Sequence, residues 1–87
     1  MTHRIQVIDS GRFSDEVEMY EKEVLPRPTG EGLAEWFVKK AAEKEEDSAG
    51  YHVLVSGLSA NSHDLFAILE YRGGALVYTV CVLATPD

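Results

Sequence analysis

The sequence predicts a small α+β domain in which an antiparallel sheet packs against two helices. Three observations lead to this class. The last third of the chain contains three apolar runs separated by turn-forming residues, the middle contains an amphipathic segment of helical period, and a short apolar run opens the chain. The 87 residues are expected to form one domain, 1–87, with a modest core. We predict the element order β-α-α-β-β-β and a sheet of three or four strands.

Residues 51–55, 65–71 and 75–83 have the length and the β-branched and aromatic content of strands. Along the last run, both alternating sets of side chains are almost wholly apolar: Leu76, Tyr78, Val80 and Val82 on one face, and Val77, Cys81 and Leu83 on the other. In an antiparallel sheet with one solvent-exposed face, apolar and polar residues alternate more regularly along each strand. Both faces are therefore expected to be covered. Either the two helices divide this cover, or a second layer, a partner or a second copy of the chain covers one face.

The first strand is predicted at residues 4–9, at an edge of the sheet or beside the last strand. The clearest helix spans residues 31–46, where Thr29 is a suitable N-cap. Its inner face contains Leu33, Trp36 and Phe37.

The segment 13–25 allows two interpretations. Val17, Tyr20 and Val24 continue a stripe of helical spacing from Phe13, and five acids between residues 15 and 23 are unfavourable in a strand. We therefore favour a helix that ends before Pro26. The alternative order is β-β-α-β-β-β, with residues 13–20 paired to the first strand, because Phe13, Val17 and Met19 also share strand parity.

The negative net charge argues against several classes of binding partner. The net charge is −7, and residues 9–47 hold twelve of the fifteen acids against six bases. Such a chain is poorly suited to bind nucleic-acid phosphates or an anionic membrane directly. The first residues show no basic segment followed by a long apolar run, so we expect a cytoplasmic protein.

No residue pattern makes a convincing site of catalysis, and no cofactor or metal is predicted. The single cysteine excludes an intramolecular disulfide, and Cys81 lies within an apolar strand. The histidines are scattered, although a hairpin could bring His52 near His63. Glu70 beside Arg72 is typical of a solvated ion pair rather than of a general acid paired with Asp64.

The sequence therefore favours a small acidic, non-enzymatic protein that binds a partner protein with a basic surface and modulates or inhibits it. A basic nucleic-acid-binding protein, inhibited by charge mimicry, is one instance. Small acidic inhibitors carried by viruses and mobile elements, anti-CRISPR proteins among them, are similar in character. The residues expected to contact the partner are acids: Asp15, Glu16, Glu18, Glu21, Glu23, Glu43, Glu45 and Glu46.

Two alternatives belong to other classes of function. One is a homodimeric α+β domain with a small-molecule pocket or weak enzymatic activity, in which Trp36, His52, His63 and Glu70 would line the pocket. The other is a structural component of a larger assembly.

Overall fold

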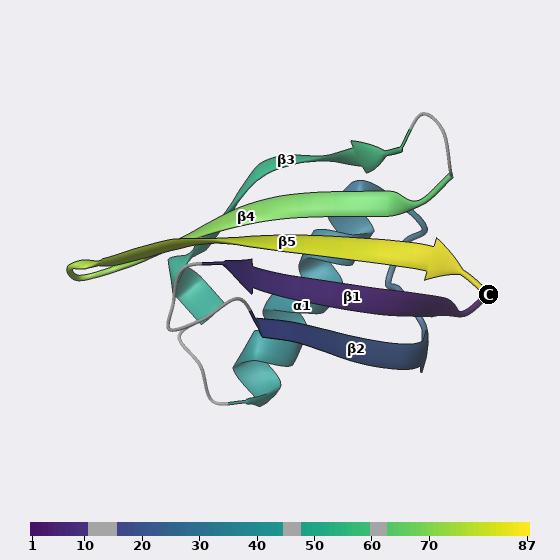
Figure 1. Ribbon diagram of the computed structural model, residues 1–87, viewed down its shortest axis with the longest axis horizontal. Coiled ribbons are helices and arrows are strands. Elements are labelled where there is room, and N and C mark those ends of the chain that lie inside the picture. The colour runs from purple at the N-terminus through teal and green to yellow at the C-terminus, as the bar shows by residue number, and fades with distance from the viewer. Residues whose placement is uncertain (11–15, 45–47, 60–62) are drawn as a thin grey trace.

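The computed structural model describes residues 1–10, 16–44, 48–59 and 63–87. Within these ranges, five strands form one antiparallel sheet and a single α-helix packs on one of its faces (Figure 1). The α+β class and the antiparallel sheet are confirmed, whereas the second helix and the limit of four strands are wrong. The elements are β1 (His3–Ser10), β2 (Glu16–Glu23), α1 (Gly30–Glu43), a 3-10 turn (Ser48–Gly50), β3 (Tyr51–Leu58), β4 (Leu65–Gly73) and β5 (Leu76–Pro86).

The sheet has the strand order β2-β1-β5-β4-β3, so β5 is the central strand. β1 and β5 pair from His3↔Pro86 to Ser10↔Thr79, so of the two predicted positions of the first strand the one beside the last strand is confirmed, and the one at an edge is wrong. This pairing joins the two ends of the chain. The hairpin of β1 and β2 and the meander of β3, β4 and β5 therefore form one continuous sheet.

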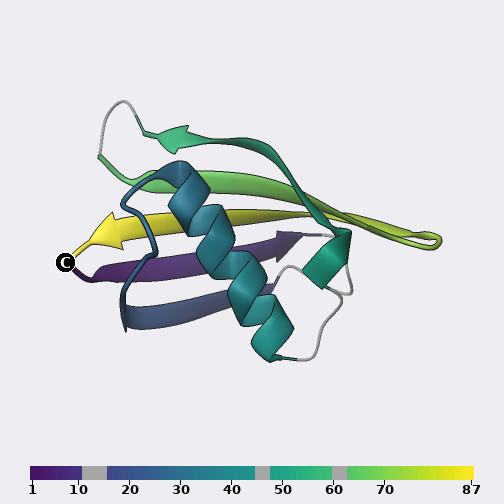
Figure 2. The same ribbon diagram turned by 180° about the vertical axis from the view of Figure 1, so that it is seen from behind.

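Helix α1 crosses the sheet diagonally, from β3 and β4 at its start to β2 at its end (Figure 2). Thr29 is the N-cap, as predicted, and its Oγ1 accepts a hydrogen bond of 2.9 Å from the Gly32 amide. The helix buries its predicted inner face, including Leu33 and Trp36, against one side of the sheet. The helix and the sheet share one core with these members: Ile5, Val7, Leu25, Leu33, Ala34, Trp36, Phe37, Leu65, Ala67, Leu69, Tyr78, Val80, Val82 and Ala84.

The segment 13–25, for which the sequence favours a helix, contains the strand Glu16–Glu23, which pairs antiparallel with β1, and residues 13–15 lie outside the described residues. The element order is therefore the alternative, β-β-α-β-β-β. The supposed helical stripe is divided between the two faces of the sheet: Val17 lies opposite Ile8, and Tyr20 lies opposite Ile5. The register shifts by one residue near the end of β2, where Lys22 has a φ of 53°.

Because α1 covers only one face, the first of the two alternatives, that two helices divide the cover of both faces, is wrong. In β4 and β5, buried side chains alternate with half-buried ones. The buried set packs against α1, and the half-buried set points to the other side. Figure 1 views the sheet from that side, with α1 behind the strands. We call this side the open face, because no element within the described residues covers it. In those same ranges, no helix has the length and apolarity needed to cross a membrane.

Candidate interaction surface

The open face carries two apolar rows that run across the sheet, as the strand register shows. One row follows Met19, Gln6, Leu83 and Phe66 to Gly57. The next row follows Val17, Ile8, Cys81, Ile68 and Val55. Each row crosses all five strands, and neither contains a charged residue. We call the apolar side chains of these rows the open-face patch: Ile8, Val17, Met19, Val55, Phe66, Ile68, Cys81 and Leu83.

The patch is most exposed at its two ends. Val17 and Met19 on β2 are 51% and 52% exposed, and Val55 on β3 is 47% exposed. The side chains between them are half-buried by their neighbours on the sheet. Cys81 lies at the middle of its row, on the central strand, and partial burial raises the pKa of its thiol. The thiol is therefore largely protonated at neutral pH and belongs to the apolar surface.

Polar residues bound the patch at both ends of the strands. Arg4 lies opposite Thr85 beyond one row. Beyond the other row, Glu70 lies opposite Thr79 on β5 and His52 on β3. The Glu70 carboxylate accepts a hydrogen bond from Arg72 Nε, and this ion pair raises the pKa of Arg72. The predicted Glu70–Arg72 pair therefore marks an edge of the patch.

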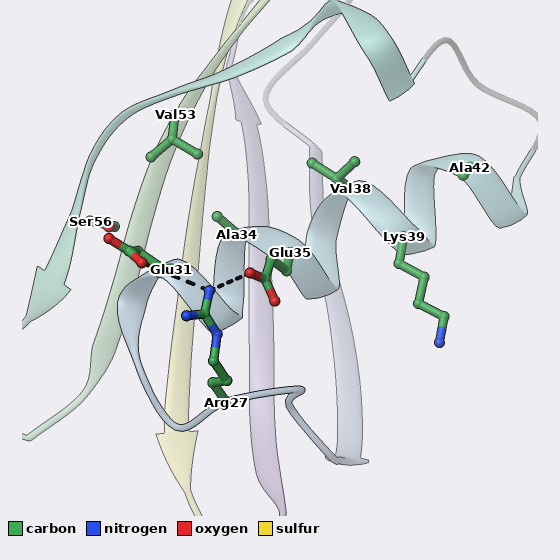
Figure 3. Close-up of a pocket in the computed structure, with 9 residues that line it drawn as sticks. All are labelled: Arg27, Glu31, Ala34, Glu35, Val38, Lys39, Ala42, Val53 and Ser56. Atoms are coloured by element: carbon green, nitrogen blue, oxygen red, sulfur yellow. Dashed lines mark hydrogen bonds and ion pairs between the residues drawn. The ribbon is translucent and has the colours of Figure 1, made fainter.

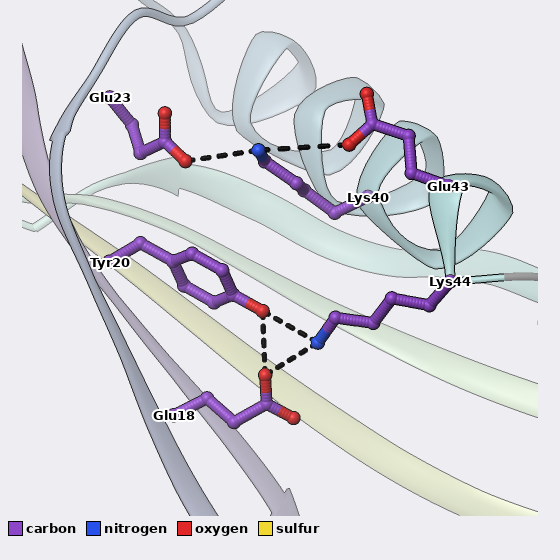
Figure 4. Close-up of polar contacts among 6 residues, drawn as sticks. All are labelled: Glu18, Tyr20, Glu23, Lys40, Glu43 and Lys44. Carbon is purple, nitrogen blue, oxygen red and sulfur yellow. Dashed lines mark hydrogen bonds and ion pairs between the residues drawn. The ribbon is translucent and has the colours of Figure 1, made fainter.

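On the opposite side of the sheet, polar contacts join α1 to β2 (Figure 4). Lys44 Nζ donates to Glu18 Oε2 and to Tyr20 Oη, both at 2.6 Å, and Tyr20 Oη donates to Glu18 at 2.6 Å. Lys40 Nζ lies 3.1 Å from Glu23 and 3.7 Å from Glu43. These contacts surround the Tyr20 ring, which also packs edge-on against Trp36 at 5.1 Å between centroids.

The contacts shift the pKa values of the three joined groups. The hydrogen bond from Lys44 is the largest cause that lowers the pKa of Glu18. Burial, followed by the hydrogen bond to Glu18, raises the pKa of Tyr20. Burial acts to lower the pKa of Lys44, but its hydrogen bonds to Glu18 and Tyr20 outweigh burial and raise it. The charged forms of Glu18 and Lys44 therefore stabilise each other in the folded chain.

The acids predicted as the partner-binding surface occupy different environments. Glu18, Glu23 and Glu43 are ion-paired to lysines of α1 on the covered side of the sheet. Glu21 is exposed on β2, the strand that also contains Glu16. Asp15, Glu45 and Glu46 lie outside the described residues. Glu18 and Glu23 thus link β2 to the end of α1, whereas Glu43 pairs with Lys40 within the helix.

The structure does not bring the predicted pocket residues together. Trp36 is buried in the core on the α1 side, whereas His52 and Glu70 are paired positions beyond the open-face patch. His63 precedes β4, at the opposite end of the β3–β4 pair from His52. Phe37, Tyr51, Tyr71 and Tyr78 instead pack into an aromatic cluster, with a hydrogen bond of 2.7 Å between the hydroxyls of Tyr51 and Tyr78.

A groove that sequence reasoning missed lies between α1 and the edge strand β3 (Figure 3). It encloses about 610 Å³. Ala34 and Val38 point from α1 toward Val53 on β3, and Lys39 extends away from them. The full lining is Arg27, Glu31, Ala34, Glu35, Val38, Lys39, Ala42, Val53 and Ser56. Arg27 is ion-paired with Glu31 and Glu35, so the rim is largely neutralised within the chain. The groove depends on the diagonal path of α1, for which the sequence gives no signal.

Within the described ranges, no three His, Cys, Asp or Glu side chains gather as a possible metal site. Comparison of the chain with protein-family models, with curated proteins and with solved structures gives no match. The open-face patch and the groove are therefore interpreted from their own geometry and chemistry.

Proposed function

We propose that this chain is a non-enzymatic protein-binding domain that modulates its partner by contact, and that it binds through the open face of its sheet. One observation carries the proposal: an apolar patch crosses all five strands and has no covering element within the described residues. Contiguous apolar surfaces larger than a few hundred Å² are uncommon on monomers and mark interaction sites. The structure supports this patch as the binding surface better than the predicted acids, because Glu18, Glu23 and Glu43 already have partners in α1.

The charge of the chain restricts which other proteins it attracts. A net charge of −7 favours approach by a basic surface and accelerates that approach at low ionic strength. A partner other than a second copy of the chain would therefore contact the open face through apolar residues and carry basic residues around them. A basic nucleic-acid-binding protein that is inhibited on binding fits this description.

The first test compares two variants as baits in extracts of the source cells. Ile68→Glu places a charge within the patch, beside Cys81, and Val53→Glu places the same charge on the other side of the sheet, where Val53 lies opposite the buried Leu69. We expect wild-type bait and Val53→Glu to retain the same proteins, and Ile68→Glu to retain at least tenfold less of them, because burying an unpaired charge is costly. Equal retention by wild type and Ile68→Glu would contradict the proposal.

The second test concerns charge steering. Raising the salt from about 0.01 M to about 1 M shortens the Debye length from ~30 Å to ~3 Å, so the association rate of a basic partner should fall. Glu21→Lys, at an exposed position of β2, should lower the same rate at low salt. A rate that responds to neither change would show that the partner is not selected by charge.

A small-molecule function is the second candidate, and the groove favours it. Its volume of about 610 Å³ lies within the range of about 300–1,000 Å³ that is common for ligand sites. Val38→Trp would fill this groove. We expect mass spectrometry of denatured protein to find a copurifying small molecule with wild type and not with Val38→Trp. A compound that is retained equally by both would place its site elsewhere.

A further inference from the structure

We propose that the open face binds a second copy of this chain, so that two sheets pack face to face in a symmetric dimer. The inference rests on the proposed function, because it names the occupant of the same surface. Two copies would bury both patches between the sheets and leave one α1 on each outer side. This arrangement provides the second layer that an apolar sheet face requires.

The size of the open face matches the requirement of a stable dimer. The strands of the sheet are 8 to 11 residues long, which is about 26 Å or more at ~3.3 Å per residue. The two apolar rows span all five strands, which is about 24 Å at ~4.8 Å per strand. A standard protein interface buries about 800 Å² on each partner. The open face of the sheet is therefore of the same order of size as one side of such an interface, without any contribution from α1.

The distribution of charge also favours a second copy on this face. The chain carries a net charge of −7, so two copies repel each other at most orientations. The two central rows contain no charged residue, and three of the glutamates are held beside α1 on the opposite side. Face-to-face packing therefore places no like charges against each other at the centre of the contact. A basic partner would find no acid within these rows to pair with its charges.

Symmetry gives Cys81 a specific position in the dimer. A two-fold contact is isologous, so the same patch of each copy covers that of the other. Cys81 lies on the central strand of the sheet and is the middle residue of its row, between Ile8 and Ile68. Packed sheets lie about 10 Å apart, with side chains interdigitating between them. The second copy should therefore cover the Cys81 thiol.

The primary experiment measures mass by sedimentation equilibrium at low and at high salt. We expect wild type to have twice the chain mass of 9.6 kDa in both, because an apolar contact is not screened. Ile68→Glu should raise the dimer dissociation constant by about 100-fold or more, since the charge enters the contact twice. Far-UV circular dichroism and urea unfolding of each variant check that the fold is retained.

A matched pair on one strand separates the two faces. Val55 and Val53 both lie on β3 and are 47% and 50% exposed, but the register shift between them turns them to opposite sides. Val55 lies opposite Ile68 of the patch, and Val53 lies opposite the buried Leu69. We expect Val55→Glu to weaken the dimer and Val53→Glu to leave it unchanged. A dimer lost with Val53→Glu and kept with Ile68→Glu would overturn the proposal and locate the contact at the β3 edge.

Alkylation of the native Cys81 tests the geometry. A monofunctional maleimide should modify Cys81 more slowly in wild type, where the second copy covers it, than in Ile68→Glu, and Cys81→Ser should not react. A stable wild-type dimer whose Cys81 reacts as fast as that of Ile68→Glu would overturn the face-to-face arrangement.

The outcomes also separate this inference from the proposed function. A wild type that stays monomeric at every concentration overturns the dimer. If its retained proteins are still lost on Ile68→Glu, the protein-binding function stands with a heterologous partner on the open face. If wild type neither dimerises nor retains any protein through Ile68, both proposals are overturned.

Discussion

Lys44 links the end of α1 to β2 through Glu18 and Tyr20, and this link should depend on pH. The folded chain lowers the pKa of Glu18 below 4.5. Its contribution to stability is therefore complete above pH 4.5 and is lost as the pH falls through the lowered value. The pKa of Lys44 is raised from 10.5, so its contribution is complete below that pH and lost only in stronger alkali.

We predict that Lys44→Met lowers the free energy of unfolding by about 0.5 kcal/mol at neutral pH, the scale of a half-exposed ion pair. Its difference from wild type should shrink well below pH 4.5, where Glu18 becomes protonated. Urea unfolding at the two pH values measures the difference. Lys39→Met removes another lysine of α1, which is exposed, and should show little effect at either pH. A difference that persists in acid would assign the effect of Lys44 to packing of its aliphatic stem against Tyr20.

At the scale of elements, the start of α1 is held against the sheet by a close backbone approach. A Cβ added at Gly30 would fall on the backbone of Gly57 in β3 and lie 3.0 Å from the carbonyl oxygen of Phe66. Neither neighbour is a flexible side chain that can rotate away. Glycine at this position therefore sets the distance between helix and sheet.

We predict that Gly30→Ala destabilises the fold by about 1–3 kcal/mol, the cost of overpacking, although alanine is the better helix former. Gly74→Asn is the control. Gly74 has a φ of 63° in the β4–β5 turn with open space around it, and asparagine tolerates that conformation. Thermal unfolding of both variants measures the difference. An unchanged or raised midpoint for Gly30→Ala would show that α1 shifts without cost.

The element that sequence reasoning misassigned is β2, and the reason is tertiary. Local propensity disfavours a strand rich in glutamate. In the fold, Glu18 and Glu23 form ion pairs with lysines at the end of α1, and the backbone of β2 pairs with β1. The two-residue spacing of Val17 and Met19 correctly indicated a strand, because both side chains point to the open face. The helical spacing of Val17 and Tyr20 arose by chance, because a segment this short holds too few apolar residues to distinguish the two periods.

The open-face patch was partly predictable from β5. Apolar residues on both sides of that strand, with Cys81 and Leu83 opposite Val80 and Val82, indicated that both faces need cover. The side that α1 leaves open, and the contribution of Val17 and Met19 from β2, depended on topology that no local pattern specifies. The α1–β3 groove depends on the helix crossing angle, which is likewise set by packing in three dimensions.

At the scale of the whole molecule, dimer formation should make stability depend on protein concentration. Two folded copies that bind each other are stabilised by mass action, because unfolded chains have no patch to pair. A concentration 100-fold above the dissociation constant adds about 2.7 kcal/mol to the folded state. The urea midpoint of wild type should therefore rise with concentration.

Ile68→Glu should abolish this dependence of stability on concentration and leave the core packing unchanged, because Ile68 points away from α1. Its urea midpoint should stay constant over the same concentrations, and that of Val53→Glu should rise like the wild type. Intrinsic fluorescence of Trp36, buried on the α1 side, reports unfolding of the chain itself rather than separation of the copies. A wild-type midpoint that is independent of concentration, measured on both sides of the expected dissociation constant, would show that each chain is stable with its open face exposed to water.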